Sequence, residues 1–117
     1  MHDKIVPKRG EIYLCDMGES ESSKQGGVRP VIILQNNKGN ECSPMTIVCP
    51  LTSQNKKQLP THMILNPKKN GVEKKSIALF EQISVVSKDK LMNKIGELDR
   101  KEIETVNKKI MISLGVI

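Results

Sequence analysis

The chain has 117 residues, of which 37% are hydrophobic and 27% are charged, and its formal net charge is +6 at pH 7. This length fits one domain with a modest core, so residues 1–117 are expected to form a single domain, and the balance of apolar and charged residues is ordinary for a soluble globular protein. No apolar run approaches the about 20 residues that cross a bilayer, and no hydrophobic signal segment follows the N-terminus, so a membrane location is not expected.

The first two thirds of the chain alternate short apolar runs with polar turns. The turn clusters at residues 36–40 and 66–71 are rich in Asn, Gly and Lys, which favour chain reversals. Tyr13 and Phe80 are the only aromatic residues, so the core is expected to be aliphatic. The predicted strands cover residues 10–17, 30–35, 45–51, 62–65 and 76–86.

The pattern changes to a helical period near the C-terminus. A short helix carrying Leu91 and Ile95 is expected to begin within residues 87–90. Asp99 and Glu102 have the spacing of a capping box, and they precede a longer helix with one apolar face. Five strands followed by helices predict a mostly β fold with some α structure, in the form of an antiparallel barrel or curled sheet with helices at one side.

The cysteines and histidines exclude several kinds of chemistry. Cys15, Cys42 and Cys49 are odd in number and form no C-x-x-C pair, so a reducing cytoplasm is expected. His2 and His62 are the only histidines, and neither has the spacing of a metal site. No phosphate-binding glycine motif of the nucleotide-binding kinds is present. The sequence therefore predicts no metal and no cofactor.

Arg29 and Thr52 are the candidate catalytic residues. Arg29 follows Gly26 and Gly27 and precedes a buried strand, whereas Thr52 directly follows the next buried strand. Adjacent antiparallel strands place the end of one beside the start of the next, so these two side chains are expected to converge. A guanidinium, a hydroxyl and glycine amides can together stabilise a pentavalent phosphorane. The residues alone fit a purely structural pair equally well.

Four ordered motifs resemble those of the MazF/PemK family of toxin endoribonucleases. Arg9-Gly10-Glu11-Ile12-Tyr13 matches the opening strand of the family. Residues 23–31 resemble its first signature, residues 48–54 its second, and Phe80-Glu81-Gln82-Ile83 its third. The similarity extends from Lys8 to Leu114.

The resemblance implies an SH3-like or CcdB-like barrel with a C-terminal helix, assembled as a homodimer. It also implies metal-independent, sequence-specific cleavage of single-stranded RNA that leaves a 2′,3′-cyclic phosphate and a 5′-hydroxyl, with Arg29 and Thr52 as the catalytic residues. A MazE-like antitoxin is the implied inhibitor. The candidate RNA-binding residues lie in or near the matching loops and are Ser23, Gln25, Gly26, Gly27, Asn36, Ser53, Gln54 and Gln82.

Two positions depart from the commonest family pattern, because Lys24 stands where Glu is usual and Ser84 where Arg is often found. Both departures leave the cleavage sequence open. The alternatives are a CcdB-like toxin that poisons DNA gyrase without cutting nucleic acid, and a regulatory barrel that binds duplex DNA.

Overall fold

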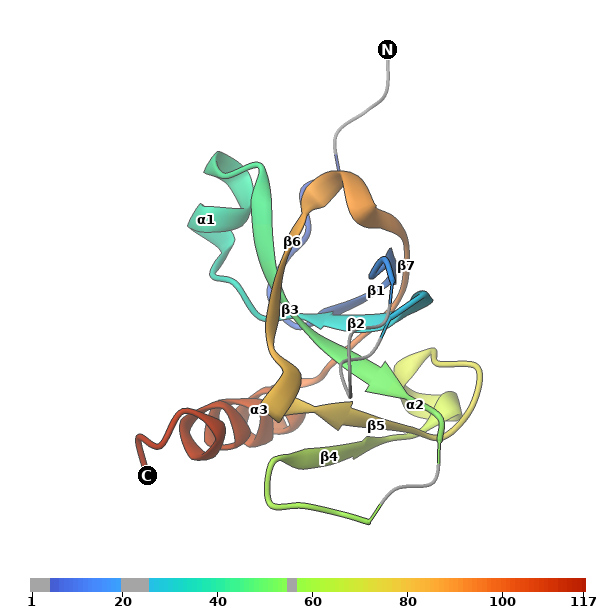
Figure 1. The fold of residues 1–117 in the computed structure, drawn as a ribbon, viewed down its shortest axis with the longest axis vertical. Coiled ribbons are helices and arrows are strands. Elements are labelled where there is room, and N and C mark those ends of the chain that lie inside the picture. The colour runs from blue at the N-terminus through green and yellow to red at the C-terminus, as the bar shows by residue number, and fades with distance from the viewer. Residues whose placement is uncertain (1–4, 20–25, 55–56) are drawn as a thin grey trace.

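The computed structural model describes residues 5–19, 26–54 and 57–117. Its main feature is a 7-stranded antiparallel sheet in which neighbouring strands follow the order β4-β5-β3-β2-β1-β7, with β6 paired to β3 (Figure 1). The strands are β1 (Glu11–Asp16), β2 (Val28–Ile33), β3 (Met45–Thr52), β4 (His62–Leu65), β5 (Ser76–Leu79), β6 (Ser84–Ser87) and β7 (Leu91–Glu97). The helical elements are α1 (Asn37–Cys42), α2 (Pro67–Asn70), η1 (Phe80–Gln82), η2 (Lys88–Lys90) and α3 (Arg100–Ser113).

The predicted fold class is confirmed, since the chain forms a mostly β structure with a C-terminal helix. The sheet curls but does not close into a barrel, because the path of paired strands ends at β4 and at β7. Among the described residues, no helix has the length and apolarity that a bilayer crossing requires.

Two mostly aliphatic clusters on opposite faces of the sheet form the core, and each contains one of the two aromatic residues, Phe80 in one and Tyr13 in the other. Alternate residues of β2 and β3 divide between them, so that Ile32 and Cys49 belong to one cluster and Val31 and Val48 to the other. Helix α3 covers the first cluster with Val106, and it lies beside β4 and η1 (Figure 1). Cys15 in β1 and Cys49 in β3 are fully buried, and they pack as small apolar residues.

The predicted continuous strand at residues 76–86 is wrong. The segment pairs with β3 twice, first at Leu51 and Thr52 through β5 and then at residues 45–48 through β6. Between these pairings the chain turns through η1, where Phe80 is buried. The number of strands is therefore larger than the five expected from the sequence.

The predicted helix carrying Leu91 and Ile95 is also wrong. Residues 88–90 form only one 3-10 turn, and β7 begins directly at Leu91. Leu91 lies opposite Cys15 of β1, so sheet pairing outweighs the i, i+4 spacing of the two apolar residues. Where a turn was predicted at residues 36–40, Asn36 caps the short helix α1 by accepting a hydrogen bond from the Gly39 N–H.

The predicted capping box at the start of α3 is confirmed. Asp99 Oδ1 accepts a 2.8 Å hydrogen bond from the Glu102 N–H, and Glu102 Oε1 accepts one of 3.0 Å from the Asp99 N–H. These bonds satisfy two amide groups near the first turn and fix where the helix begins after β7.

Candidate functional site

Arg29 is held at the start of β2 by two backbone carbonyls. Its Nε donates a hydrogen bond of 2.8 Å to the Gly26 oxygen, and its Nη1 donates one of 3.1 Å to the Leu51 oxygen. Gly27, between Gly26 and the strand, has a φ of 75°, a left-handed conformation that favours glycine. The turn therefore brings the Gly26 carbonyl back to the side chain that it orients.

Thr52 ends β3 beside this guanidinium. Val31 pairs with Pro50, and continuing that register by two residues places Arg29 opposite Thr52. Thr52 is only 3% exposed, and its Oγ1 accepts a 3.2 Å hydrogen bond from the Gln54 N–H. Among the described residues, no acceptor takes its hydroxyl proton, so the hydroxyl can donate to a ligand. The structure thus places a cation and a small hydroxyl at neighbouring strand positions.

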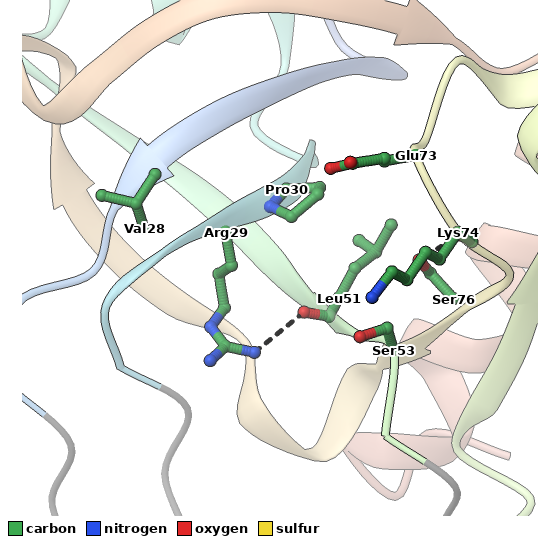
Figure 2. A pocket seen from close by; sticks show the side chains of 8 residues that line it. All are labelled: Val28, Arg29, Pro30, Leu51, Ser53, Glu73, Lys74 and Ser76. Carbon is green, nitrogen blue, oxygen red and sulfur yellow. Dashed lines mark hydrogen bonds between the residues drawn. The ribbon is translucent and has the colours of Figure 1, made fainter.

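An open pocket of about 240 Å³ lies next to the Arg29 side chain (Figure 2). Its apolar lining residues are Val28 and Pro30 of β2 and Leu51 of β3, of which Leu51 is almost fully buried. The polar lining residues are Arg29, Ser53, Glu73, Lys74 and Ser76. Because the last three of these come from the segment between α2 and the start of β5, three separate parts of the sequence form the pocket together.

Partial burial lowers the pKa of the Arg29 guanidinium below its ordinary value. The group nevertheless stays charged at neutral pH, because guanidinium groups lose their proton only above about pH 12. In the part of the chain that the structure describes, its Nη2 has no hydrogen-bond partner. The site therefore presents donors suited to a phosphate, in a fixed geometry.

The other predicted RNA-binding residues divide into three groups. Gly26, Gly27, Ser53 and Gln54 lie around Arg29 and Thr52. Asn36 does not, since it lies beyond the opposite end of β2, where it caps α1, and Gln82 lies in η1 and does not line the pocket. Ser23 and Gln25, like the departure at Lys24, fall outside the described residues.

Sequence reasoning missed Glu73 and Ser76 as pocket residues. The pair Lys74-Lys75 was recognisable as a source of positive charge for an RNA backbone. No local pattern marks Glu73, because its position depends on the long-range pairing of β3 with β5.

His62 and Glu81 form a second polar contact near the end of β5. His62 is 2% exposed, and its Nδ1 accepts a 3.1 Å hydrogen bond from the Leu59 N–H. Its Nε2 therefore carries the ring proton and donates a hydrogen bond of 3.0 Å to Glu81 Oε2. Desolvation raises the pKa of the Glu81 carboxyl, but hydrogen bonds from His62, Thr61 and the backbone outweigh it and lower that pKa overall. His62 therefore orders the sheet edge, and it does not line the pocket beside Arg29.

No group of three or more His, Cys, Asp and Glu side chains suited to a metal ion occurs among residues 5–19, 26–54 and 57–117. Fold and site together define a small β domain that presents a fixed arginine, hydroxyl groups and a partly apolar pocket to an anionic ligand.

Comparison with known proteins places this domain in a family. Residues 8–114 match the family described as PemK-like, MazF-like toxins of type II toxin–antitoxin systems. The chain is 41% identical over 114 residues to the endoribonuclease EndoA of Bacillus subtilis, covering 97% of this chain and 98% of that protein. It is 42% identical over 110 residues to the endoribonuclease MazF of Staphylococcus saprophyticus, covering 93% and 92%. The chain belongs to the PemK/MazF family of toxins.

Solved structures confirm the fold. The MazF crystal structure from Deinococcus radiodurans superposes with a TM-score of 0.81 at 23% identity and covers 95% of this chain and 98% of that one. A mycobacterial endoribonuclease in complex with its cognate antitoxin gives a TM-score of 0.79 at 24% identity and covers 95% and 97%.

Proposed function

We propose that this protein is a toxin that cuts single-stranded RNA at short sequences without a metal ion, leaving a 2′,3′-cyclic phosphate and a 5′-hydroxyl. Its class follows from the family: the chain is an endoribonuclease, at 41–42% identity to named endoribonucleases over nearly its whole length. This activity is preferred over gyrase poisoning and over duplex DNA regulation, because neither alternative accounts for those relatives.

The observation that supports the chemistry is the fixed guanidinium next to Thr52. In the proposed reaction the ribose 2′-oxygen attacks the adjacent phosphorus, and the bond from phosphorus to the 5′-oxygen breaks. A water molecule accepts the 2′-hydroxyl proton, and a second water molecule donates a proton to the leaving 5′-oxygen. Arg29 donates hydrogen bonds to the nonbridging oxygens as their charge grows, and Thr52 donates one from its hydroxyl. DNA lacks the attacking hydroxyl and is not cut.

Three further parts of the proposal concern assembly and place of action. The resemblance to MazF-type toxins supports a homodimer. Structures of related toxins with a cognate antitoxin, including MazE–MazF of Deinococcus radiodurans, support inhibition by a MazE-like antitoxin. Three free cysteines and an RNA substrate support action in the cytoplasm.

The experiment is digestion of a long unstructured RNA in EDTA by the wild-type protein, Arg29→Ala, Arg29→Lys and the control Arg100→Ala. Arg100 is an exposed arginine at the start of α3 and does not line the pocket. We expect wild type and Arg100→Ala to cut and to leave cyclic phosphate ends. Both Arg29 variants should lose cleavage, because lysine lacks the planar fork that Arg29 uses. Folding is checked by circular dichroism.

Near wild-type cutting by either Arg29 variant would contradict the role of Arg29. Loss of wild-type cutting in EDTA, or 3′ ends without cyclic phosphate, would contradict the metal-free mechanism.

A further inference from the structure

Two charged side chains line the pocket beside Arg29 without a partner of their own. Glu73 and Lys74 face the pocket from the side opposite β2, and Lys74 extends towards Leu51 and Ser53 (Figure 2). Among the described residues, neither side chain makes a hydrogen bond or an ion pair with another. A carboxylate is an acceptor only and an ammonium a donor only, so both groups are available to a ligand.

The segment that carries these residues is firmly anchored. Gly71 has a φ of +76°, and a Cβ there would lie 2.0 Å from the Ile95 oxygen of β7. Asn70 is 1% exposed, its Oδ1 accepts a 3.1 Å hydrogen bond from the Asn66 N–H, and its Nδ2 donates one of 2.9 Å to Glu102. Glu73 lies two residues beyond this anchor and Ser76 begins β5, so both ends of the segment are fixed.

The pocket also has a surface suited to a flat ring. Val28 and Pro30 present apolar surface next to the guanidinium, while the side chain of Leu51 is buried beneath them in the core. A ligand whose phosphate contacts Arg29 would therefore place the neighbouring base against Val28 and Pro30. The edge of that base would then face Glu73 and Lys74.

We propose that this pocket binds a nucleobase beside the cleaved bond, and that Glu73 selects bases with an exocyclic amino group. This inference rests on the proposed function. Cytosine, adenine and guanine present amino donors to the carboxylate. Uracil has no amino group, and its single ring N–H donor lies between two carbonyl oxygens that the carboxylate repels. Lys74 balances the charge of Glu73, so the pocket does not repel the RNA backbone. Glu73 is thus a specificity residue of the same site.

The test uses wild-type protein, Glu73→Gln, Glu73→Ala and the control Glu104→Gln on a randomised RNA pool, with the cut ends sequenced. Glu104 is an exposed glutamate of α3, outside the pocket. We expect wild type and Glu104→Gln to disfavour uracil about tenfold or more at one position flanking the cut. Glu73→Gln should relax this preference because its amide can also donate to a carbonyl oxygen, and Glu73→Ala should remove it.

A second measurement uses the best single substrate with its amino-bearing base replaced by the analogue that lacks the amino group, which is uracil for cytosine and hypoxanthine for adenine or guanine. The change should slow wild type about tenfold and Glu73→Ala far less. Unchanged base preference in both Glu73 variants would overturn the inference, as would a uniform rate loss on all substrates, which would make Glu73 a proton acceptor. Cutting by wild type in either case leaves the proposed function intact, whereas no cutting by wild type contradicts that function itself.

Discussion

The hydroxyl of Thr52 is almost completely buried, while the guanidinium of Arg29 reaches into an open pocket. This difference assigns them different tasks. Arg29 can bind an incoming phosphate, and Thr52 can donate only to an atom that is already seated at the end of β3. Its acceptance of the Gln54 N–H also fixes how the chain leaves that strand.

Replacing Thr52 with Val should slow cleavage by about 10²–10³-fold with little change in substrate affinity. The reason is that one donor to the transition-state oxygens is lost while the shape of the side chain is kept. Thr52→Ser should recover most of the rate. Single-turnover kinetics at saturating RNA measure both variants, and equal rates for Val and Ser would remove the hydroxyl from the mechanism.

At the residue scale, the glycine–arginine–proline segment and the hydroxyls after β3 were recognisable because they flank buried strands. Glu73 was not recognisable, because nothing in its neighbourhood distinguishes it from the exposed lysines and glutamates of the surface. Asn36 had the right residue type for base recognition, but its side chain is used to cap α1. A local sequence pattern therefore predicts the role of a polar residue only where the neighbouring strand already fixes the direction of its side chain.

The backbones at the end of α2 and in β7 approach each other closely beside the pocket segment. A Cβ at Gly71 would meet the Ile95 oxygen at 2.0 Å, and one at Gly96 would meet the Asn70 oxygen at 2.0 Å. Two elements far apart in sequence therefore touch main chain to main chain, and both positions need glycine. This contact determines where the wall of the pocket begins.

Gly71→Ala should lower the free energy of unfolding by about 3 kcal/mol or more, because backbone must move as well as adopt a strained φ. Gly115→Ala is the matched control, since Gly115 has a φ of +74° with nothing within 4 Å of a Cβ. The control should cost only about 1–2 kcal/mol. Urea denaturation of both variants measures the difference, and equal losses would show that the contact is relaxed at no cost.

The predicted bounds of strands and helices were correct wherever the local sequence pattern and the long-range strand pairing favoured the same structure. Residues 62–65 form a strand as predicted, and the capping box locates the start of α3. Residues 76–87 could not be predicted as two strands, because the break depends on β3 changing partner from β5 to β6. Similarly, the strand β7 results from pairing with β1, which the helical spacing of Leu91 and Ile95 did not reveal.

At the scale of the whole molecule, the mostly β class with a terminal helix was predictable, but the open ends of the sheet were not. The sheet would close only if β4 and β7 formed hydrogen bonds with each other. The apolar pattern of neither segment predicts whether this pairing forms. The order of the strands likewise depends on β3, which pairs with β2, β5 and β6.

The proposed homodimer predicts a solution mass of about twice 13.1 kDa by light scattering after gel filtration. The mass should persist on tenfold dilution in the micromolar range, because obligate subunits rarely separate there. A monomer mass at the concentration at which RNA is cut would contradict the dimer while leaving the cleavage chemistry unaffected.

Strand β3 has a consequence for how this protein can fail. It supplies the Leu51 carbonyl that orients Arg29, carries Thr52 at its tip and joins three other strands. A mutation that destabilises β3 should therefore disrupt both the fold and the catalytic site. Folded but inactive variants of this toxin are expected to carry mutations at the rim of the pocket. Cells that survive because of a mutation in β3 should instead contain no detectable toxin, since the unfolded chain would be degraded.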